Sequence, residues 1–268
     1  MMADLLKRSL APLTDEAWQA VDTAAATILK AQLTARTLVD FSGPHGWQFA
    51  AVNMGRIDIP KGGSDESIPW GVRTVLPLVE VRVPVIIPQL ELDNASRGCT
   101  DIDLSSLEDA AKRVAHFEDA AVYSGFGPGG IQGIVQEAAH KPVKLPENPE
   151  LYPKAIAEGL KELRLAGVPG PYSLVLGVDA YAGLIQAGKG GFPPARIIHD
   201  MLGGQILASQ VLQGGVLLSS AGGDFELTVG QDLAIGYASH DRKEVELFLT
   251  ESFTFRVLRP EAAIELSA

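Results

Sequence analysis

The amino-acid sequence predicts an α+β protein, because helical and extended patterns occur in mixed order without a regular βαβ repeat. Three observations support this prediction. An amphipathic helical pattern lies near the start of the chain, and a longer one occupies 105–124. β-branched and aromatic residues are densest at 245–256, as expected of strands. Two extended segments flank a polar, glycine-rich turn at 61–66, which indicates a long hairpin.

The composition is that of a globular chain. Its 268 residues are 46% hydrophobic and 21% charged, which is sufficient for a sizeable core. The formal net charge of −11 argues against non-specific nucleic-acid binding, which needs a basic surface. Cys99 is the single cysteine, so no intramolecular disulfide can form, and we expect a free thiol near a turn. Long apolar runs are absent and the first residues do not resemble a secretory signal, so we expect a cytoplasmic protein without membrane contact.

The two main helices have recognisable starts. At 14–37, a capping threonine precedes two acids that suit the positive end of the helix dipole, and apolar residues then follow at helical spacing. The run 40–44 (DFSGP) breaks this helix. The second helix, 105–124, begins with a capping box of Ser105 with Glu108 and is predicted to be the longest in the chain.

The remaining elements follow from shorter patterns. Extended segments at 49–59 and 72–84 form the long hairpin, which needs another surface to lie on, because an isolated two-stranded hairpin is marginally stable. We further expect helices at 153–166, 179–187 and 197–202, and strands at 172–177, 216–219, 225–230, 234–237 and 245–256.

Two glycine-rich segments match nucleotide-binding loops in letters but not in context. Residues 125–130 (GFGPGG) match G-x-G-x-x-G, but this motif must follow a strand, whereas a predicted helix precedes it here. Residues 183–189 (GLIQAGK) match the start of a phosphate loop, but Gly190 stands where Ser or Thr should bind magnesium. We therefore interpret both as turns that end helices.

No catalytic or metal site is legible in the sequence. The five histidines are not part of an H-E-x-x-H pattern or beside a cysteine pair, and the G-x-S-x-G turn of serine hydrolases is absent. Asp101 and Asp103 offer oxygen ligands, but the glycine of a calcium loop is missing, so a capped turn is the better interpretation. A catalytic triad assembled only in space cannot be read from one sequence. The residues alone thus favour a structural protein over an enzyme.

Several sequence blocks, in order along nearly the whole chain, carry a family resemblance. They are 5–14 (LLKRSLAPLT), 39–47 (VDFSGPHGW), 76–82 (LPLVEVR), 91–94 (ELDN), 167–172 (GVPGPY), 222–227 (GGDFEL), 230–237 (GQDLAIGY) and 251–257 (ESFTFRV). Together they resemble the encapsulins, also called linocin-type bacteriocin proteins. The second block matches the family signature V-D-x-x-G-P-x-G-W.

The resemblance implies the fold of tailed-phage major capsid proteins and a homo-oligomer that closes into an icosahedral shell around a cargo enzyme. The implied cargoes are ferritin-like proteins or dye-decolourising peroxidases, which connects the shell indirectly to iron storage or oxidative-stress defence. The implied division is an N-terminal helix and the start of a peripheral domain at 1–49, an extended loop at 50–78, the peripheral domain with the long helix at 79–133, an axial domain with a pore loop at 134–222, and a return to the peripheral domain at 223–268.

In this family the cargo docks through a short C-terminal peptide, against the N-terminal helix and the peripheral strands. By position, the implied peptide-binding residues here are Leu29, Leu33, Arg36, Asp40, Asp232, Ile235 and Tyr237. The alternative for the apolar members is ordinary core packing, and Arg36 could simply pair with Asp40 four residues on.

The resemblance also places a five-fold pore loop at the end of the 179–187 helix. Its residues here are Gln186, Gly188, Lys189, Gly190 and Gly191. Lysines gathered around a symmetry axis would attract small anions and repel cations. The alternative is that Lys189 points into bulk solvent.

Two further expectations concern cofactors and rival functions. Some relatives bind a flavin through a tryptophan just before the E-L-D block, but Leu90 stands there, so we expect no cofactor. A prophage capsid subunit that packages DNA is the alternative function, and the net charge of −11 argues against it. A protease or bacteriocin, suggested by the older family naming, lacks a legible nucleophile and base.

Overall fold

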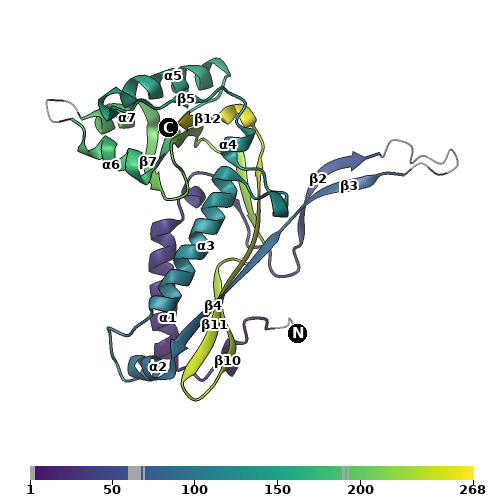
Figure 1. The fold of residues 1–268 in the computed structure, drawn as a ribbon. Helices are drawn as coiled ribbons and strands as arrows, with labels where there is room; N and C mark the ends of the chain where they lie inside the picture. Colours follow the sequence, from purple (N-terminus) through teal and green to yellow (C-terminus); the bar gives the residue numbers. More distant parts are fainter. Residues whose placement is uncertain (1–3, 60–67, 69, 189–190, 192) are drawn as a thin grey trace.

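A computed structural model describes residues 4–59, 68, 70–188, 191 and 193–268 of the chain (Figure 1). Its helices are α1 (Asp15–Gln32), α2 (Gln89–Ser96), α3 (Ser105–Ser124), α4 (Ile134–Glu137), α5 (Tyr152–Leu165), α6 (Val178–Gln186) and α7 (Pro194–Leu202). Its strands are β1 (Asp40–Ser42), β2 (Ala51–Asp58), β3 (Val72–Pro77), β4 (Val79–Pro88), β5 (Val143–Lys144), β6 (Tyr172–Gly177), β7 (Gly203–Ser209), β8 (Gly215–Ser219), β9 (Phe225–Val229), β10 (Ala234–His240), β11 (Glu244–Val257) and β12 (Ala263–Ser267). Helices and strands are mixed as the sequence predicts.

The first sheet is built around β11. Strand β4 pairs antiparallel along one side of it, while β10 and β9 pair with its first and last parts on the other side. Strand β1 extends the sheet by parallel pairing with β9. From Leu247 to Phe255 every residue of β11 is buried, polar ones included. Both faces are therefore covered, which explains why this strand is a continuous β-forming run instead of an alternating one.

Helices α1 and α3 lie side by side against the lower part of this sheet (Figure 1). Val21 of α1, Leu107 of α3 and Leu247 of β11 are all fully buried in one apolar cluster. Each such side chain contributes roughly 1.5–3 kcal/mol on leaving water. This packing holds α1 in place, and α1 forms one wall of the candidate site.

The predicted cap of α1 is confirmed, whereas α3 begins at Ser105 as predicted but without the predicted capping box. Thr14 Oγ1 accepts a hydrogen bond from the Ala17 N–H at 3.3 Å. The capping box expected at Ser105 is absent, since no side chain caps α3. Instead Asp103 Oδ1 accepts the Ser105 N–H at 3.0 Å, which makes an Asx turn just before the helix.

Helix α1 also ends earlier than predicted, at Gln32 instead of near Thr37. The buried carboxylate of Asp119 accepts the backbone N–H groups of Thr34 and Ala35, at 3.1 and 3.0 Å. These bonds turn the chain out of the helix into a short 3-10 turn, η2 (Ala35–Thr37). The helical spacing beyond Gln32 could not reveal this, because Asp119 lies far along the sequence.

The second sheet has the strand order β5-β12-β8-β6-β7 and is surrounded by α5, α6 and α7 in the upper part of Figure 1. The strand predicted at 172–177 is confirmed as β6, with every residue buried. Strand β12 pairs antiparallel with β8 and parallel with β5. Residues 263–267 therefore belong to the second sheet. The division implied by the family resemblance instead assigned the whole of 223–268 to the peripheral domain.

Strands β2 and β3 form an arm that projects from the molecule (Figure 1). They pair antiparallel from Ala51↔Pro77 to Asp58↔Val72, with a shift in register between Asn53 and Arg56. The polar turn predicted at 61–66 lies outside the described residues. The extended segment predicted at 72–84 is two strands, since the pairing partner changes from β2 to β11 at Leu78.

Candidate functional site

A groove of about 300 Å³ lies between α1 and β10. On α1 the lining residues fall at i, i+3, i+4 and i+7, a spacing that places them on one helix face. The groove is hollow because several of its lining side chains are small, and the larger apolar side chains form its floor. The lining residues are Arg8, Asp22, Ala25, Ala26, Leu29, Leu233, Ala234, Ile235 and Leu249.

A charged pair lies at the rim of this groove. Arg8 donates to both carboxylate oxygens of Asp22, at 3.0 and 2.7 Å, and its guanidinium lies 3.8 Å from the ring centre of Trp18. Neither Arg8 nor Asp22 belongs to the residues predicted from the sequence. Trp18 and Asp22 are one helical turn apart on α1, and this spacing was the available signal for a shared partner.

Arg36 is the centre of a separate, largely buried ion cluster. Its Nε and Nη2 atoms donate to Glu118, at 2.6–2.9 Å, and its Nη1 donates to Asp232 at 2.8 Å. Nη2 also donates to Glu251. Both Glu118 and Glu251 have fully buried side chains. The cluster joins η2, α3, β11 and the turn before β10 at one point.

The charges in this cluster do not balance. Burial raises the pKa of Glu251 well above its ordinary value, and the neighbouring Glu118 raises it further. Burial opposes the charge of Arg36, but hydrogen bonds and charge from Glu118, with the charge of Glu251, outweigh that effect and raise the pKa of Arg36. Glu251 Oε2 has no hydrogen-bond partner in the described part of the chain. A proton on Glu251 would relieve the repulsion from Glu118.

The structure distributes the seven predicted peptide-binding residues over several surroundings. Leu29 and Ile235 both line the groove. Leu33 is buried in the same apolar cluster without lining it, and Tyr237 packs against that cluster with its hydroxyl 2.5 Å from His240 Nδ1. Arg36 and Asp232 belong to the ion cluster.

Asp40 has its own role. Its Oδ2 accepts the backbone N–H of Gly223 at 2.6 Å, and this bond ties β1 to the turn before β9. Gly223 has a φ of +85°, which only glycine adopts readily. The alternative pairing of Arg36 with Asp40 is therefore wrong, because Arg36 turns toward buried carboxylates on other elements.

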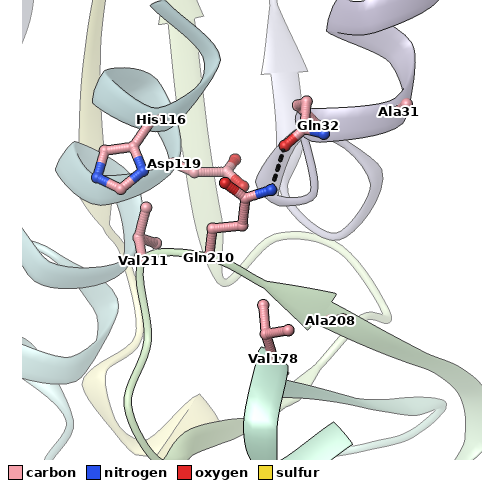
Figure 2. A pocket seen from close by; sticks show the side chains of 8 residues that line it. All are labelled: Ala31, Gln32, His116, Asp119, Val178, Ala208, Gln210 and Val211. Atoms are coloured by element: carbon pink, nitrogen blue, oxygen red, sulfur yellow. Dashed lines mark hydrogen bonds between the residues drawn. The ribbon is translucent and has the colours of Figure 1, made fainter. Parts of the chain in front are cut away.

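A second pocket, of about 220 Å³, lies where α1 and α3 meet the upper part of the molecule (Figure 2). Gln210, which follows β7, donates from Nε2 to Gln32 Oε1 at 2.9 Å across it. His116 and Asp119 line the same pocket. Burial raises the pKa of Asp119 to about 6, although its bonds to Thr34 and Ala35 work in the opposite direction. The hydrogen bond between Gln32 and Gln210 links the end of α1 to the residue that follows β7.

The pore-loop prediction falls partly outside the described residues, which omit Lys189 and Gly190. Gln186 is the exposed last residue of α6. The Gly188 N–H donates to Glu150 Oε1 at 2.8 Å, and its φ of +100° together with the adjacent Pro193 backbone excludes a side chain there. Gly191 is exposed. The role of this loop stays a prediction.

Other sequence features have structural explanations. Residues 125–130 follow α3 directly, and Phe126 pairs with Ile131 across the tight turn, as expected of a helix-ending loop. Leu90 lies exposed in the first turn of α2, and Cys99 is an exposed free thiol. In the part of the chain that the structure describes, no cluster of three metal-ligating side chains is found, and no helix could span a membrane.

Comparison with known proteins identifies the family. The family profile described as "Encapsulating protein for peroxidase" matches residues 2–254. The type 1 encapsulin shell protein of Rhodospirillum rubrum is 41% identical, over 99% of this chain and 96% of that protein. The chain belongs to the encapsulin family. Encapsulin shell proteins of Mycobacterium tuberculosis and Rhodococcus erythropolis are 38% and 37% identical, each over 98% of this chain and at least 98% of the relative.

Solved structures support the same fold. The virus-like particle of Pyrococcus furiosus superimposes with a TM-score of 0.65 at 16% identity, covering 92% of this encapsulin and 98% of that chain. The capsid of Myoviridae Phage XM1 gives a TM-score of 0.57 at 12% identity, with 87% and 90% covered. The capsid-protein fold implied by the sequence blocks is therefore confirmed.

Proposed function

We propose that this encapsulin is the subunit of a closed icosahedral shell, and that its β2–β3 arm lies across a second copy of the chain. The observation that carries the proposal is the exposure of apolar side chains along the arm. Ile57 is 61% exposed, Val72 58% and Val75 52%, and within the described residues β2 and β3 form a separate two-stranded sheet. Such a hairpin gains stability only when another surface covers it.

Shell assembly is tested by size-exclusion chromatography and negative-stain electron microscopy of the purified chain. Uniform hollow spheres support the proposal, since a closed point-group assembly yields one particle size. Nucleic acid inside those spheres, measured by the ratio of absorbance at 260 and 280 nm, would instead support the prophage-capsid alternative. A stable monomer or dimer at physiological salt rejects the shell.

We also propose that the groove between α1 and β10 binds the C-terminal peptide of a cargo protein inside the cytoplasmic shell. Leu29 and Ile235 form the apolar floor on which one side chain of an extended peptide can rest. Leu33 belongs to the same buried apolar cluster as Leu29 and Ile235, and Tyr237 packs against that cluster. Arg36, Asp40 and Asp232 act indirectly, because their contacts hold η2, β1 and the turn before β10 in position.

The proposed cargo is a peroxidase or a ferritin-like protein, and the subunit itself has no catalytic role. The matching family profile, described as encapsulating a peroxidase, supports the first class. We propose that substrates enter through a pore whose loop includes 186–191, with Lys189 favouring small anions. A Lys189→Glu shell with unchanged anion and cation entry would reject this charge selectivity.

Ala26 offers a sharp test of the groove, because it is exposed and lines the hollow. Ala26→Trp should fill the groove and reduce encapsulated peroxidase at least about ten-fold, since docking would lose its apolar anchor. Thr27→Trp is the matched control, being the next exposed residue of α1 but no part of the lining. The cargo is a co-expressed dye-decolourising peroxidase, with and without its C-terminal tail. Equal loading of both variants rejects this groove as the docking site.

A further inference from the structure

The open edge of β10 is already occupied by the beginning of the same chain. Among the described strands β10 pairs with β11 alone, so no strand of the sheet covers its other edge. Leu6 O accepts the Tyr237 N–H at 2.8 Å, and Arg8 Nη1 donates to Ile235 O at 3.4 Å. Unpaired groups at a strand edge are a template for an added strand. Residues 4–8 thus stand where an extended peptide would bind.

The hold of this segment on β10 is weak by several measures. Among the described residues, its one backbone hydrogen bond to β10 is the one accepted by Leu6. Lys7 has a φ of +50°, a left-handed conformation that disfavours residues with a Cβ, and it is the one non-glycine residue of the described chain with a positive φ. Leu5 and Leu10 remain 42% and 66% exposed. The docked conformation is strained and buries little.

Arg8 is the main anchor of the segment. It stacks on Trp18 at 3.8 Å and makes the two hydrogen bonds to Asp22, while both Arg8 and Asp22 line the groove. If Arg8 leaves, Asp22 loses its partner at the rim of an apolar hollow. A basic side chain on the incoming peptide is the group that would restore the pair.

We propose that residues 4–8 are a displaceable strap, and that a cargo peptide enters the groove by exchanging with it. The peptide backbone takes over the Tyr237 N–H and the Ile235 carbonyl, an apolar side chain fills the hollow, and a basic side chain replaces Arg8 on Asp22. This inference rests on the groove being the docking site. It adds that residues 4–8 compete with the cargo peptide, and that the peptide needs a basic side chain to pair with Asp22. The fitting partner is an extended apolar peptide with one basic residue, the chemistry of the strap itself.

The probe is therefore a labelled synthetic peptide of residues 2–12 of this chain, titrated onto full-length subunits and followed by fluorescence anisotropy. Arg8→Ala should bind the probe about ten-fold more tightly, because the strap has lost an ion pair and a cation–π contact. Lys7→Gly should bind it more weakly than the unmodified chain, because glycine accepts the left-handed conformation and secures the strap. Lys30→Ala, an exposed basic residue of α1 outside the groove lining, is the control and should change nothing.

Two results would overturn the strap. One is equal affinity of the unmodified chain and Arg8→Ala, including no binding by either. The other is an unchanged hydrogen-exchange rate of the Tyr237 amide in Arg8→Ala, since a loosened strap must expose that N–H. Either result leaves the Ala26→Trp loading test intact, so failure of the strap and failure of the groove are distinguishable.

Discussion

Strand β11 and the β2–β3 arm are both rich in β-branched residues, yet they stand at opposite extremes of burial. Phe253 and Phe255 in β11 are at most 1% exposed, whereas Val72 and Val75 in the arm are more than half exposed. The first region has partner strands on both sides and helices against it, while each arm strand pairs with the other alone. The same residue types thus stabilise the subunit in one place and remain available for a second subunit in the other.

This difference separates the part of the molecule that stabilises the folded subunit from the part that is available for assembly. Stability of the separate subunit should depend on β11 and its neighbours, and stability of the shell should depend on the arm. The following predictions test that division. Each concerns the free energy of unfolding of unassembled subunits, because assembly itself would stabilise the folded state by mass action.

The largest effect is expected for Phe253→Ala. Phe253 is fully buried and makes an edge-on contact with Phe117, their ring centres 6.0 Å apart. Removing the ring should leave a cavity and lower the free energy of unfolding by about 3–5 kcal/mol. Urea denaturation followed by circular dichroism measures this. A loss near zero would mean that β11 is not the centre of the core.

The second prediction concerns Glu251 and pH. Because burial and Glu118 raise its pKa, folded Glu251 keeps a proton that the unfolded chain loses near the ordinary carboxyl pKa. The stabilising effect is complete below that ordinary value and is lost as the pH rises toward the folded pKa.

Glu251→Gln holds this position neutral at every pH. The unmodified subunit should therefore lose stability relative to the variant as the pH rises above the ordinary carboxyl pKa, by up to about 1.4 kcal/mol per pH unit. Urea denaturation at several pH values measures the difference. Parallel pH profiles for the two proteins would show that Glu251 is ionised in the folded subunit.

The third prediction concerns the start of α1. Thr14→Ala removes the acceptor of the Ala17 N–H and should lower the free energy of unfolding by about 1 kcal/mol. Thr14→Ser, which keeps the hydroxyl, is the control and should restore most of the loss. If alanine and serine behave alike, the cap contributes nothing to the subunit.

The smallest effect on the subunit, and the most informative for the comparison, is expected for Val75→Asp on the arm. Val75 is 52% exposed, so the free energy of unfolding should change by less than about 0.5 kcal/mol. Shell assembly should fail, because a charge would face the apolar surface that the arm covers. Light scattering measures assembly. Normal shells from this variant would contradict the proposed role of the arm.

Local chemistry in the sequence determined much of the fold. The threonine cap, the 20-residue α3 and the strand at 172–177 each depend on neighbours along the chain, and each is confirmed. The predicted end of α1 was wrong because of a distant partner: the helix stops early since Asp119 accepts the backbone N–H groups of Thr34 and Ala35. The pairing of β12 with β8 likewise joins distant segments. Helix α2, with a weakly amphipathic sequence, was missed altogether.

For the candidate site, too, some features were predictable from the sequence and others appear only in the tertiary structure. The family resemblance pointed to Leu29 and Ile235 as peptide-binding residues, and the structure shows that both line one groove. Only the tertiary structure decided that Arg36 faces Glu118 and Glu251 instead of Asp40, and that Arg8 reaches Asp22. Spacing along a helix limits which neighbours a side chain can meet. The choice of a partner across the fold depends on burial and charge, which appear only when separate segments come together.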